Sequence, residues 1–198
     1  NLRAAEKVKV VAFGGGHGLA STLSALRDIT PEITAVVTVA DNGGSSGKIR
    51  AEFDFLPPGD LRMALAALCG ADSWGQNWAQ LIQHRFSSRG DLNGHTLGNL
   101  LLAALWDSSE DKVAGIDRVG ELLKIVGRVL PMSLDPLQIE GIFETTAGEK
   151  RIRGQVEVAS AKGRLRSLKL HPENPRVTPE VLESVAVADW LTFGPGSW

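Results

Sequence analysis

Two apolar runs, joined by a glycine turn and a helical pattern, constrain the fold of this chain more than any other feature. The first run, residues 8–13 (VKVVAF), ends in three glycines, and leucines then recur at helical spacing. Thr30-Pro31 ends the helical pattern, and residues 33–40 (ITAVVTVA) form a β-branched run suited to a strand buried on both faces. Strand, helix and strand in this order predict a right-handed parallel unit.

The rest of the chain predicts helices first and then an antiparallel segment. Helical patterns cover residues 60–69, 76–86, 96–106 and 113–126. The runs IEGIFET, RIRGQVEV and RLRSLKL suggest an antiparallel set that partly faces solvent, and the second alternates through Val158. Thr178-Pro179 then opens a helix, and residues 189–193 return to a buried strand. We therefore predict one α/β domain with a β insertion.

Composition excludes several classes of partner as the default. The chain has 198 residues, a formal net charge of -2 and a single cysteine, Cys69. This charge shows no excess of basic residues of the kind that binds nucleic acid, and no apolar run is long enough to cross a bilayer. One cysteine excludes internal disulfides, and we expect a cytoplasmic location. Because TFGPGSW stops directly after a strand and a glycine turn, we expect residues 1–198 to be a single domain truncated on its C-terminal side.

The glycine turn after the first strand is a candidate ligand site. Glycines between a strand and a helix let the backbone approach a ligand, and the helix N-terminus attracts phosphate. The match to the dinucleotide pattern G-x-G-x-x-G is imperfect, so a purely structural tight turn stays open. The candidate residues are Gly14, Gly15, Gly16, His17 and Gly18.

A second candidate follows the next strand, in the stretch VADNGGSSGK. It is not a P-loop, because Asn42 stands where the first glycine belongs and Ile49 follows Lys48. An acid after the second strand of a doubly wound sheet can hold a ribose, and Asp41 has this position. We interpret the following residues as a flexible loop around a diphosphate, with Lys48 and Arg50 adding positive charge; a solvated surface loop is the alternative. The candidates are Asp41, Asn42, Gly43, Gly44, Ser45 and Ser46.

Three further stretches carry polar residues at helix or strand ends. In PPGDLR, Asp60 is expected to cap a helix, and alone it carries no functional argument. GHTLGN places polar groups at the start of an apolar helix, and GPGS repeats the pattern of a strand followed by glycine. The candidates are Pro58, Gly59, Asp60, Arg62, His95, Thr96, Asn99, Gly194, Gly196 and Ser197.

Taken together, these motifs resemble those of one family. FGGGHG resembles GGGTG, VTVADNGGSSG resembles VTVADDGGSSG, and LPPGDLR, GHTLGN and GPGS resemble the remaining signatures of the YvcK-like gluconeogenesis factors. That family belongs with the 2-phospho-L-lactate transferases (CofD) of deazaflavin cofactor biosynthesis. The resemblance runs from Val8 to the end of the chain, in the same order.

The resemblance implies both a fold and a function. It implies a Rossmann-like, three-layer α/β fold, mostly parallel, with helices on both faces and further elements after GPGS. GGSSG, at residues 43–47, implies the gluconeogenesis factors rather than the transferases. Those factors are described as binding UDP-sugars such as UDP-N-acetylglucosamine and as supporting cell shape and wall synthesis during gluconeogenic growth. We expect a nucleotide sugar as ligand, a homo-oligomer, and a cell-wall or signalling protein as partner.

Two departures from the family motifs keep other functions open. His17 replaces the threonine of GGGTG, and Asn42 replaces the second acid, which weakens a two-carboxylate magnesium site and leaves Asp41 alone for one metal contact. One alternative is a phosphotransferase in which Asp41, Asp60 and Arg62 position a diphosphate donor. Another is a nicotinamide-dependent dehydrogenase, in which NAD would occupy the same glycine turn.

Overall fold

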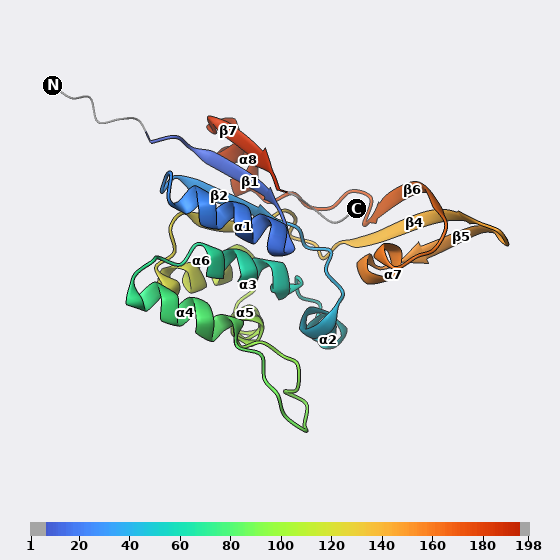
Figure 1. Cartoon of the computed structure of the whole chain (residues 1–198), viewed down its shortest axis with the longest axis horizontal. Helices are drawn as coiled ribbons and strands as arrows, with labels where there is room; N and C mark the ends of the chain where they lie inside the picture. Colours follow the sequence, from blue (N-terminus) through green and yellow to red (C-terminus); the bar gives the residue numbers. More distant parts are fainter. Residues whose placement is uncertain (1–6, 195–198) are drawn as a thin grey trace.

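A four-stranded parallel sheet lies at the centre of the computed structural model, which describes residues 7–194 (Figure 1). Its order is β3-β2-β1-β7, and every neighbouring pair is parallel. The first two strands are the two apolar runs of the N-terminal unit. The strands are β1 (Val10–Gly14), β2 (Ile33–Val37), β3 (Arg128–Pro131) and β7 (Trp190–Phe193).

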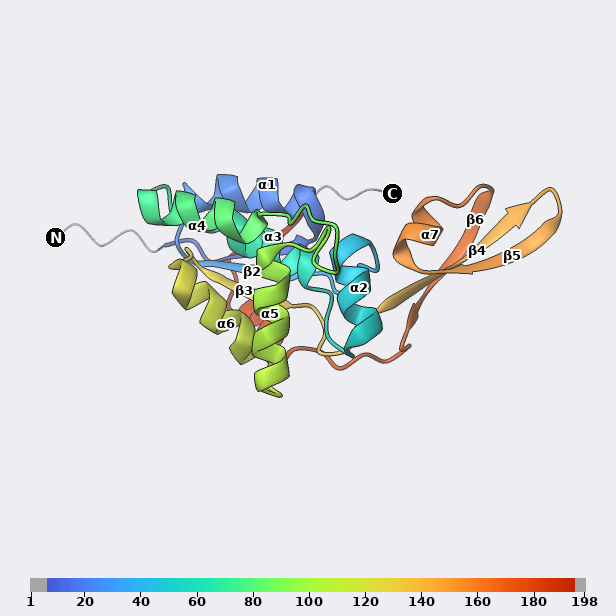
Figure 2. The same ribbon diagram turned by 90° about the horizontal axis from the view of Figure 1, so that it is seen from below.

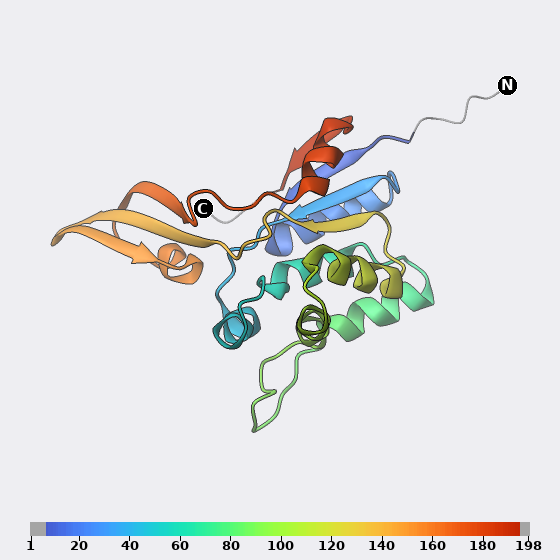
Figure 3. The same ribbon diagram turned by 180° about the vertical axis from the view of Figure 1, so that it is seen from behind.

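Helices cover both faces of this sheet, which confirms the layered α/β fold. On one face, α3 lies beneath α1 and packs against α4 and α5, while α6 packs against β3 (Figure 1). On the other face lies α8, seen best from behind (Figure 3). The helices are α1 (Gly16–Arg27), α3 (Pro58–Ala67), α4 (Ser73–Gln83), α5 (Leu97–Ser108), α6 (Lys112–Leu123) and α8 (Pro179–Ala186).

The apolar pattern of β1 explains why the sheet needs two helical layers. Val10 and Ala12 are buried in the larger core, on the side of α1 and α3. Val11 points the other way and is buried with Val181 of α8. Because successive side chains of a strand point to opposite faces, a strand with no polar alternation must be covered on both.

The antiparallel segment forms a separate sheet that projects from the parallel one (Figures 1 and 2). We call residues 138–171 the β arm. Its strand order is β5-β4-β6, so β4 lies between two edge strands. Its elements are β4 (Gln138–Thr145), β5 (Gly148–Arg153), α7 (Gln155–Ala159) and β6 (Arg164–His171).

Several expectations from the sequence are wrong in detail. The alternation of RIRGQVEV is not one strand: Gly154 has φ of 110° and ends β5, and α7 follows. The residues interpreted as a flexible loop up to Ser46 instead start helix α2 (Gly44–Glu52), and both Ser45 and Ser46 are buried. The helix expected at 76–86 runs from Ser73 to Gln83. The strand expected to be buried at 189–193 is the edge strand β7, in which Trp190 and Phe193 are exposed.

Within residues 7–194, no helix has the length and apolar character that crossing a membrane requires.

Candidate functional site

The carboxyl ends of β1 and β2 meet the N-termini of several helices at one edge of the parallel sheet. We call this region the glycine edge: residues 14–18, 38–46, 58–62 and 95–99. The chain leaves β1 directly into α1, whereas β2 is followed by a short loop and α2, and α3 begins nearby (Figure 1). Ligands of open α/β sheets bind outside the carboxyl ends of the strands, so this is the expected place for a site.

The glycine turn after β1 allows a carboxylate to approach the start of α1. A Cβ atom on Gly15 would lie 2.4 Å from Thr38 Oγ1 and 2.5 Å from Asp60 Oδ2. Asp60 accepts hydrogen bonds from Thr38 Oγ1, at 3.2 Å, and from the backbone N–H of Gly16. Glycine is therefore required here because the backbone closely approaches the side chains of Thr38 and Asp60.

A second close approach joins the residues after β2 to α3. Asp41 Oδ1 accepts a hydrogen bond of 2.9 Å from Gly43 N, and Ser46 Oγ accepts one of 3.0 Å from Gly59 N. A Cβ on Gly59 would lie 2.5 Å from Ser46 Oγ and 3.0 Å from Asp41 Oδ2. Asp41 thus lies directly beside the start of α3, on the side where Asp60 also lies.

A chain of hydrogen bonds connects α2, α5 and α3. Ser45 Oγ lies 3.0 Å from His95 Nδ1 and accepts a bond of 3.0 Å from Asn99 Nδ2. Asn99 Oδ1 in turn accepts a bond of 3.0 Å from Arg62 Nε, and Arg62 Nη1 donates to Gln83 Oε1 at 2.6 Å. Three motifs that are far apart in sequence are therefore linked side chain to side chain.

The electrostatics of this edge combine helix N-termini with two acids. Gly15 and Gly43 are the N-caps of α1 and α2, and as glycines they supply no side-chain cap. Each helix N-terminus is equivalent to roughly +0.5 elementary charge, which attracts anions. Burial, and secondly the charge of Asp41, raise the pKa of Asp60. Burial also lowers the pKa of Arg62. The edge is suited to a ligand that carries both anionic and hydroxyl groups.

Asn42 is oriented away from these acids and toward the β arm. Its Nδ2 donates a hydrogen bond of 2.7 Å to Glu157 Oε2, and its Oδ1 accepts one of 3.1 Å from Val156 N. Both groups belong to the first turn of α7. An aspartate could accept the second bond but would repel Glu157, so an amide suits this position.

The two cations after the loop do not point to a common ligand. Arg50 donates to the carbonyl oxygens of Asp41, at 3.0 Å, and Leu137, at 3.2 Å, and so holds the loop to the start of the β arm. Lys48 donates to Asn93 O at 2.9 Å on the surface. Both cations thus contact backbone carbonyl oxygens, and their expected role in binding a diphosphate stays a prediction.

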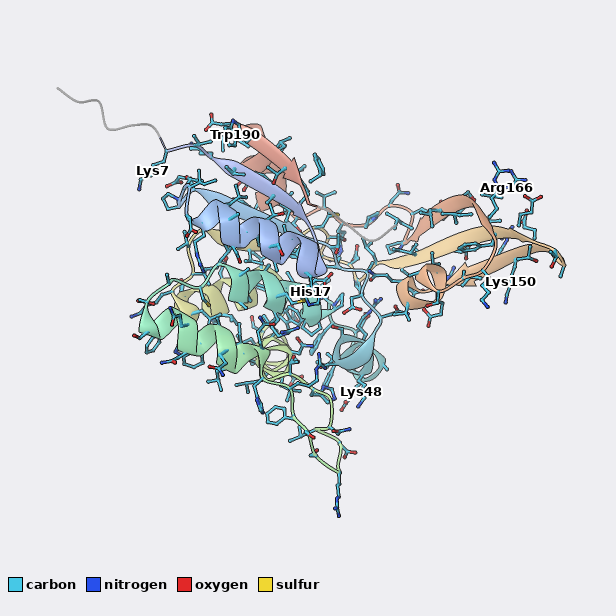
Figure 4. The ribbon with its side chains drawn as sticks, in the orientation of Figure 1. Lys7, His17, Lys48, Lys150, Arg166 and Trp190 are labelled. Atoms are coloured by element: carbon cyan, nitrogen blue, oxygen red, sulfur yellow. The ribbon has the colours of Figure 1, made fainter. Side chains whose placement is uncertain are left out.

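The remaining candidates differ in how closely they approach the edge. His17 is exposed on the first turn of α1, and Gly18 follows it (Figure 4). Pro57, not Asp60, is the N-cap of α3, with Pro58 as its first residue and Asp60 in its first turn. Thr96 is the N-cap of α5 and is buried, but its hydroxyl caps nothing. Gly194 N donates to Phe13 O at 3.0 Å. Gly196 and Ser197 lie outside the described residues.

A cavity of about 620 Å³ lies on the other side of α2, at the root of the β arm. Asn42 and Arg50 border it, together with Phe55, Arg153 and His171. Arg50 donates to backbone carbonyls, and Arg153 and His171 both lie near Glu140, at 3.3 and 3.5 Å. Arg50 and Arg153 thus already have partners within the protein, whereas the buried Nε2 of His171 makes no hydrogen bond to any residue that the structure describes.

Sequence reasoning missed three residues of this region. Thr38 bonds Asp60, Gln83 bonds Arg62, and Glu157 bonds Asn42. Thr38 lies within the strand-like run that precedes Asp41, so its position was available as a signal. Gln83 and Glu157 belong to no motif, and nothing local in the sequence marks them.

The residues present can offer two adjacent carboxylates to a magnesium ion. Asp41 and Asp60 are close enough for the charge of one to raise the pKa of the other. Within residues 7–194 there is no group of three or more His, Cys, Asp or Glu side chains arranged to hold a metal. A magnesium ion prefers near-octahedral oxygen coordination and commonly takes one or two carboxylates plus phosphate oxygens. The pair therefore fits magnesium only when a ligand supplies further oxygens.

Comparison with known proteins gives consistent matches along almost the whole chain. The family model described as 2-phospho-L-lactate transferase CofD matches residues 10–198. A relative from Mycobacterium tuberculosis strain H37Rv is 50% identical over 193 residues, which cover 96% of this chain and 56% of the relative. A gluconeogenesis factor from Halalkalibacterium halodurans is 39% identical over 192 residues, covering 97% and 58%. The chain thus spans little more than half the length of these relatives.

Two crystal structures from Bacillus halodurans have the same fold. One has a TM-score of 0.88 and 39% identity, covering 96% of this chain and 60% of that chain. The other, described as a member of the UPF0052 family, has a TM-score of 0.86 and 38% identity, covering 98% and 60%. The parallel sheet and the β arm described above are thus similar to solved structures over nearly their full extent.

Proposed function

The chain belongs to the CofD family, which includes the gluconeogenesis factors, and from this premise we propose that it binds a UDP-sugar at the glycine edge and acts as a regulator. UDP-N-acetylglucosamine is the first ligand to test. The regulated processes would be cell shape and cell-wall synthesis during gluconeogenic growth, in the cytoplasm. Such a protein would act by binding, without turnover of its ligand.

One observation carries this proposal: the N-termini of α1 and α2, whose N-cap residues are glycines, lie at the same sheet edge as Asp41. Neither N-cap residue supplies a side-chain cap, so the first backbone N–H groups of the two helices remain suited to phosphate oxygens, apart from Gly16 N, which donates to Asp60. Asp41 Oδ1 is held by Gly43 N, and none of the hydrogen bonds among the described residues reaches Asp41 Oδ2. A diphosphate flanked by a ribose needs this combination of donors and one acceptor.

Different residues of the glycine edge would bind different parts of the UDP-sugar. Asp41 would accept hydrogen bonds from the ribose hydroxyls, and Gly44 to Ser46 would present N–H groups to the diphosphate. The bonds from Ser45 to His95 and Asn99 hold the first turn of α2 in place. Arg62 acts through Asn99 and is a positioning residue in this scheme.

A phosphotransferase is the second candidate, favoured by the adjacency of Asp41 and Asp60. Two neighbouring carboxylates at the glycine edge fit a magnesium–diphosphate complex, because magnesium is commonly held by one or two carboxylates together with phosphate oxygens. The ion would supply charge neutralisation for the transferred group when bound, and Asp41 and Asp60 would hold it. The family model's description as a transferase supports keeping this candidate.

Calorimetry and thermal unfolding of the whole protein test the proposal. UDP-N-acetylglucosamine at a hundred times its dissociation constant is expected to add about 2.7 kcal/mol of stability, and inorganic phosphate at equal concentration none. Asp41→Asn is expected to weaken binding at least tenfold, whereas Glu149→Gln on β5 leaves it unchanged.

The alternatives give different results in the same assay. Magnesium-dependent conversion of a nucleoside diphosphate donor, abolished in Asp41→Asn and Asp60→Asn, would favour the transferase. Stabilisation by NAD but by no UDP-sugar would reject the proposal and favour the dehydrogenase interpretation of the glycine turn.

A further inference from the structure

β6 is one of the two edge strands of the β arm, and like β5 it has a single neighbour among the described strands. β6 pairs with β4, which in turn pairs with β5, so one edge of β6 carries backbone N–H and C=O groups that no described strand takes. Seven of its eight residues are exposed. An edge of this kind is a template for a further strand.

The side chains of β6 are sorted by face. Leu170, Leu168 and Leu165 lie opposite Ile139, Gly141 and Phe143 of β4, so all three leucines share one face of the arm. The register shifts by one residue between Ile142 and Phe143, and this bulge keeps Leu165 on the same face as the other two. These leucines are 43%, 55% and 46% exposed, in order along the chain, and so form an uncovered apolar stripe.

The other face of β6 carries positive charge. Arg164 and Lys169 lie opposite Glu144 and Glu140, yet neither belongs to an ion pair among residues 7–194. Arg166, at the bulge, pairs with Glu144. Figure 4 shows Arg166 and Lys150 on the part of the arm farthest from the parallel sheet.

Charge is distributed unevenly between the arm and the rest of the chain. The β arm, residues 138–171, contains seven of the chain's 21 lysines and arginines and four of its 23 acids. The chain as a whole has a formal net charge of -2, so this segment opposes the overall sign. Like charges on Arg164, Arg166 and Lys169 disfavour pairing of β6 with a second copy of itself and favour an acidic strand.

We propose that the open edge of β6 binds an extended segment of a partner protein in which acidic and apolar residues alternate. Such a segment would add a fourth strand to the arm, with its backbone bonded to β6. Its apolar side chains would lie on the stripe of Leu165, Leu168 and Leu170, and its acids would face Arg164, Arg166 and Lys169. This site is separate from the glycine edge and does not depend on a nucleotide sugar.

A labelled peptide tests this assignment on the whole protein. The probe is a ten-residue peptide of alternating glutamate and valine, followed by fluorescence anisotropy at 0.15 M salt. We expect saturable binding that weakens at least tenfold in Arg164→Glu/Lys169→Glu and in Leu168→Asp. Lys150→Glu/Arg151→Glu on β5 makes the same charge change on the opposite edge, and here we expect less than a threefold loss.

Two further measurements separate strand addition from simple charge attraction. A peptide of the same composition with its glutamates and valines in separate blocks is expected to bind at least tenfold more weakly. Hydrogen exchange should show new protection of β6 amides and none of β5. Equal binding of both peptides, equal loss in the β5 variant, or no protection of β6 would each overturn the proposal. Circular dichroism and the unfolding midpoint confirm that the variants are folded.

Discussion

The glycine edge and the β arm use the same kinds of polar side chain in opposite surroundings. At the edge, Arg62 is 7% exposed and bonds two neutral side-chain oxygens. On the arm, the side chain of Arg153 is 52% exposed and pairs with Glu140. A buried donor that loses its partner has no water to replace it, whereas an exposed one does. We therefore expect the buried hydrogen bonds of Arg62 to neutral oxygens to contribute more to stability than the exposed ion pair of Arg153 with Glu140.

The largest expected effect separates these two arginines. Arg62→Met leaves the buried Asn99 Oδ1 without its donor and removes a second bond to the exposed Gln83, and we expect a loss of about 3 kcal/mol of unfolding free energy. Arg153→Met should cost less than about 1 kcal/mol. Urea unfolding of both variants measures the difference, and equal losses would remove the basis of the comparison.

A smaller loss of unfolding free energy is expected when a methyl group is added to Gly15, where the backbone lies close to two side chains. A Cβ on Gly15 would overlap Thr38 Oγ1 and Asp60 Oδ2, so Gly15→Ala should cost about 2 kcal/mol. Gly90 has no atom within 4 Å of its Cβ position and serves as the control, with a change of about 0.5 kcal/mol or less. Thermal unfolding in which Gly15→Ala matches the control would show that this contact is relaxed at no cost.

Removing a charge at the edge is expected to stabilise the protein in a pH-dependent way. Burial raises the pKa of Asp60, so the folded state favours its protonated form, and ionised Asp60 costs stability at neutral pH. Asp60→Asn should therefore add about 1 kcal/mol at pH 7. The gain should vanish as the pH falls through the raised pKa and the wild-type carboxyl becomes protonated. A gain that grows on acidification would contradict this sign, and Glu149→Gln on exposed β5 is the control.

The smallest effect concerns the contact that joins the two regions. Asn42→Asp replaces a donor to Glu157 with a like charge, and because the pair is exposed we expect a cost of about 1 kcal/mol or less. The change should appear chiefly as faster amide exchange in α7. Adding Glu157→Gln places a donor opposite the introduced carboxylate and should restore the slow exchange. If the double variant exchanges as fast as Asn42→Asp alone, the contact does not hold α7.

Local patterns predicted the elements of the glycine edge but not the directions of its side chains. The run of strand, glycine turn, helix and strand placed Gly15 and Asp41 at one edge, as the sheet register confirms. Asp41 and Asn42 are adjacent in sequence, yet Asn42 turns to α7, whose contacting residues lie 114 and 115 positions away. No local sequence pattern predicts a contact between residues so far apart.

The start of α2 was missed for a related reason. Its first turn contains Gly44, Ser45, Ser46 and Gly47, which have low helix propensity. Ser45 Oγ accepts a hydrogen bond from Asn99 of α5, and Ser46 Oγ accepts one from Gly59 N of α3, so tertiary contacts override the local preference. In the β arm the prediction is wrong for the opposite reason, because a local feature overrides the pattern. The alternation of apolar and polar residues predicts a continuous strand, but Gly154, with a positive φ, ends it.

Hydrogen exchange of the whole protein with and without UDP-N-acetylglucosamine tests the central claim most directly. Binding at the glycine edge predicts new protection within residues 14–18, 43–47 and 58–62, and no change in β6 at residues 164–171. Protection confined to the border of the cavity behind α2, around residues 50–55 and 153, would contradict this account, as would an unchanged pattern at saturating ligand.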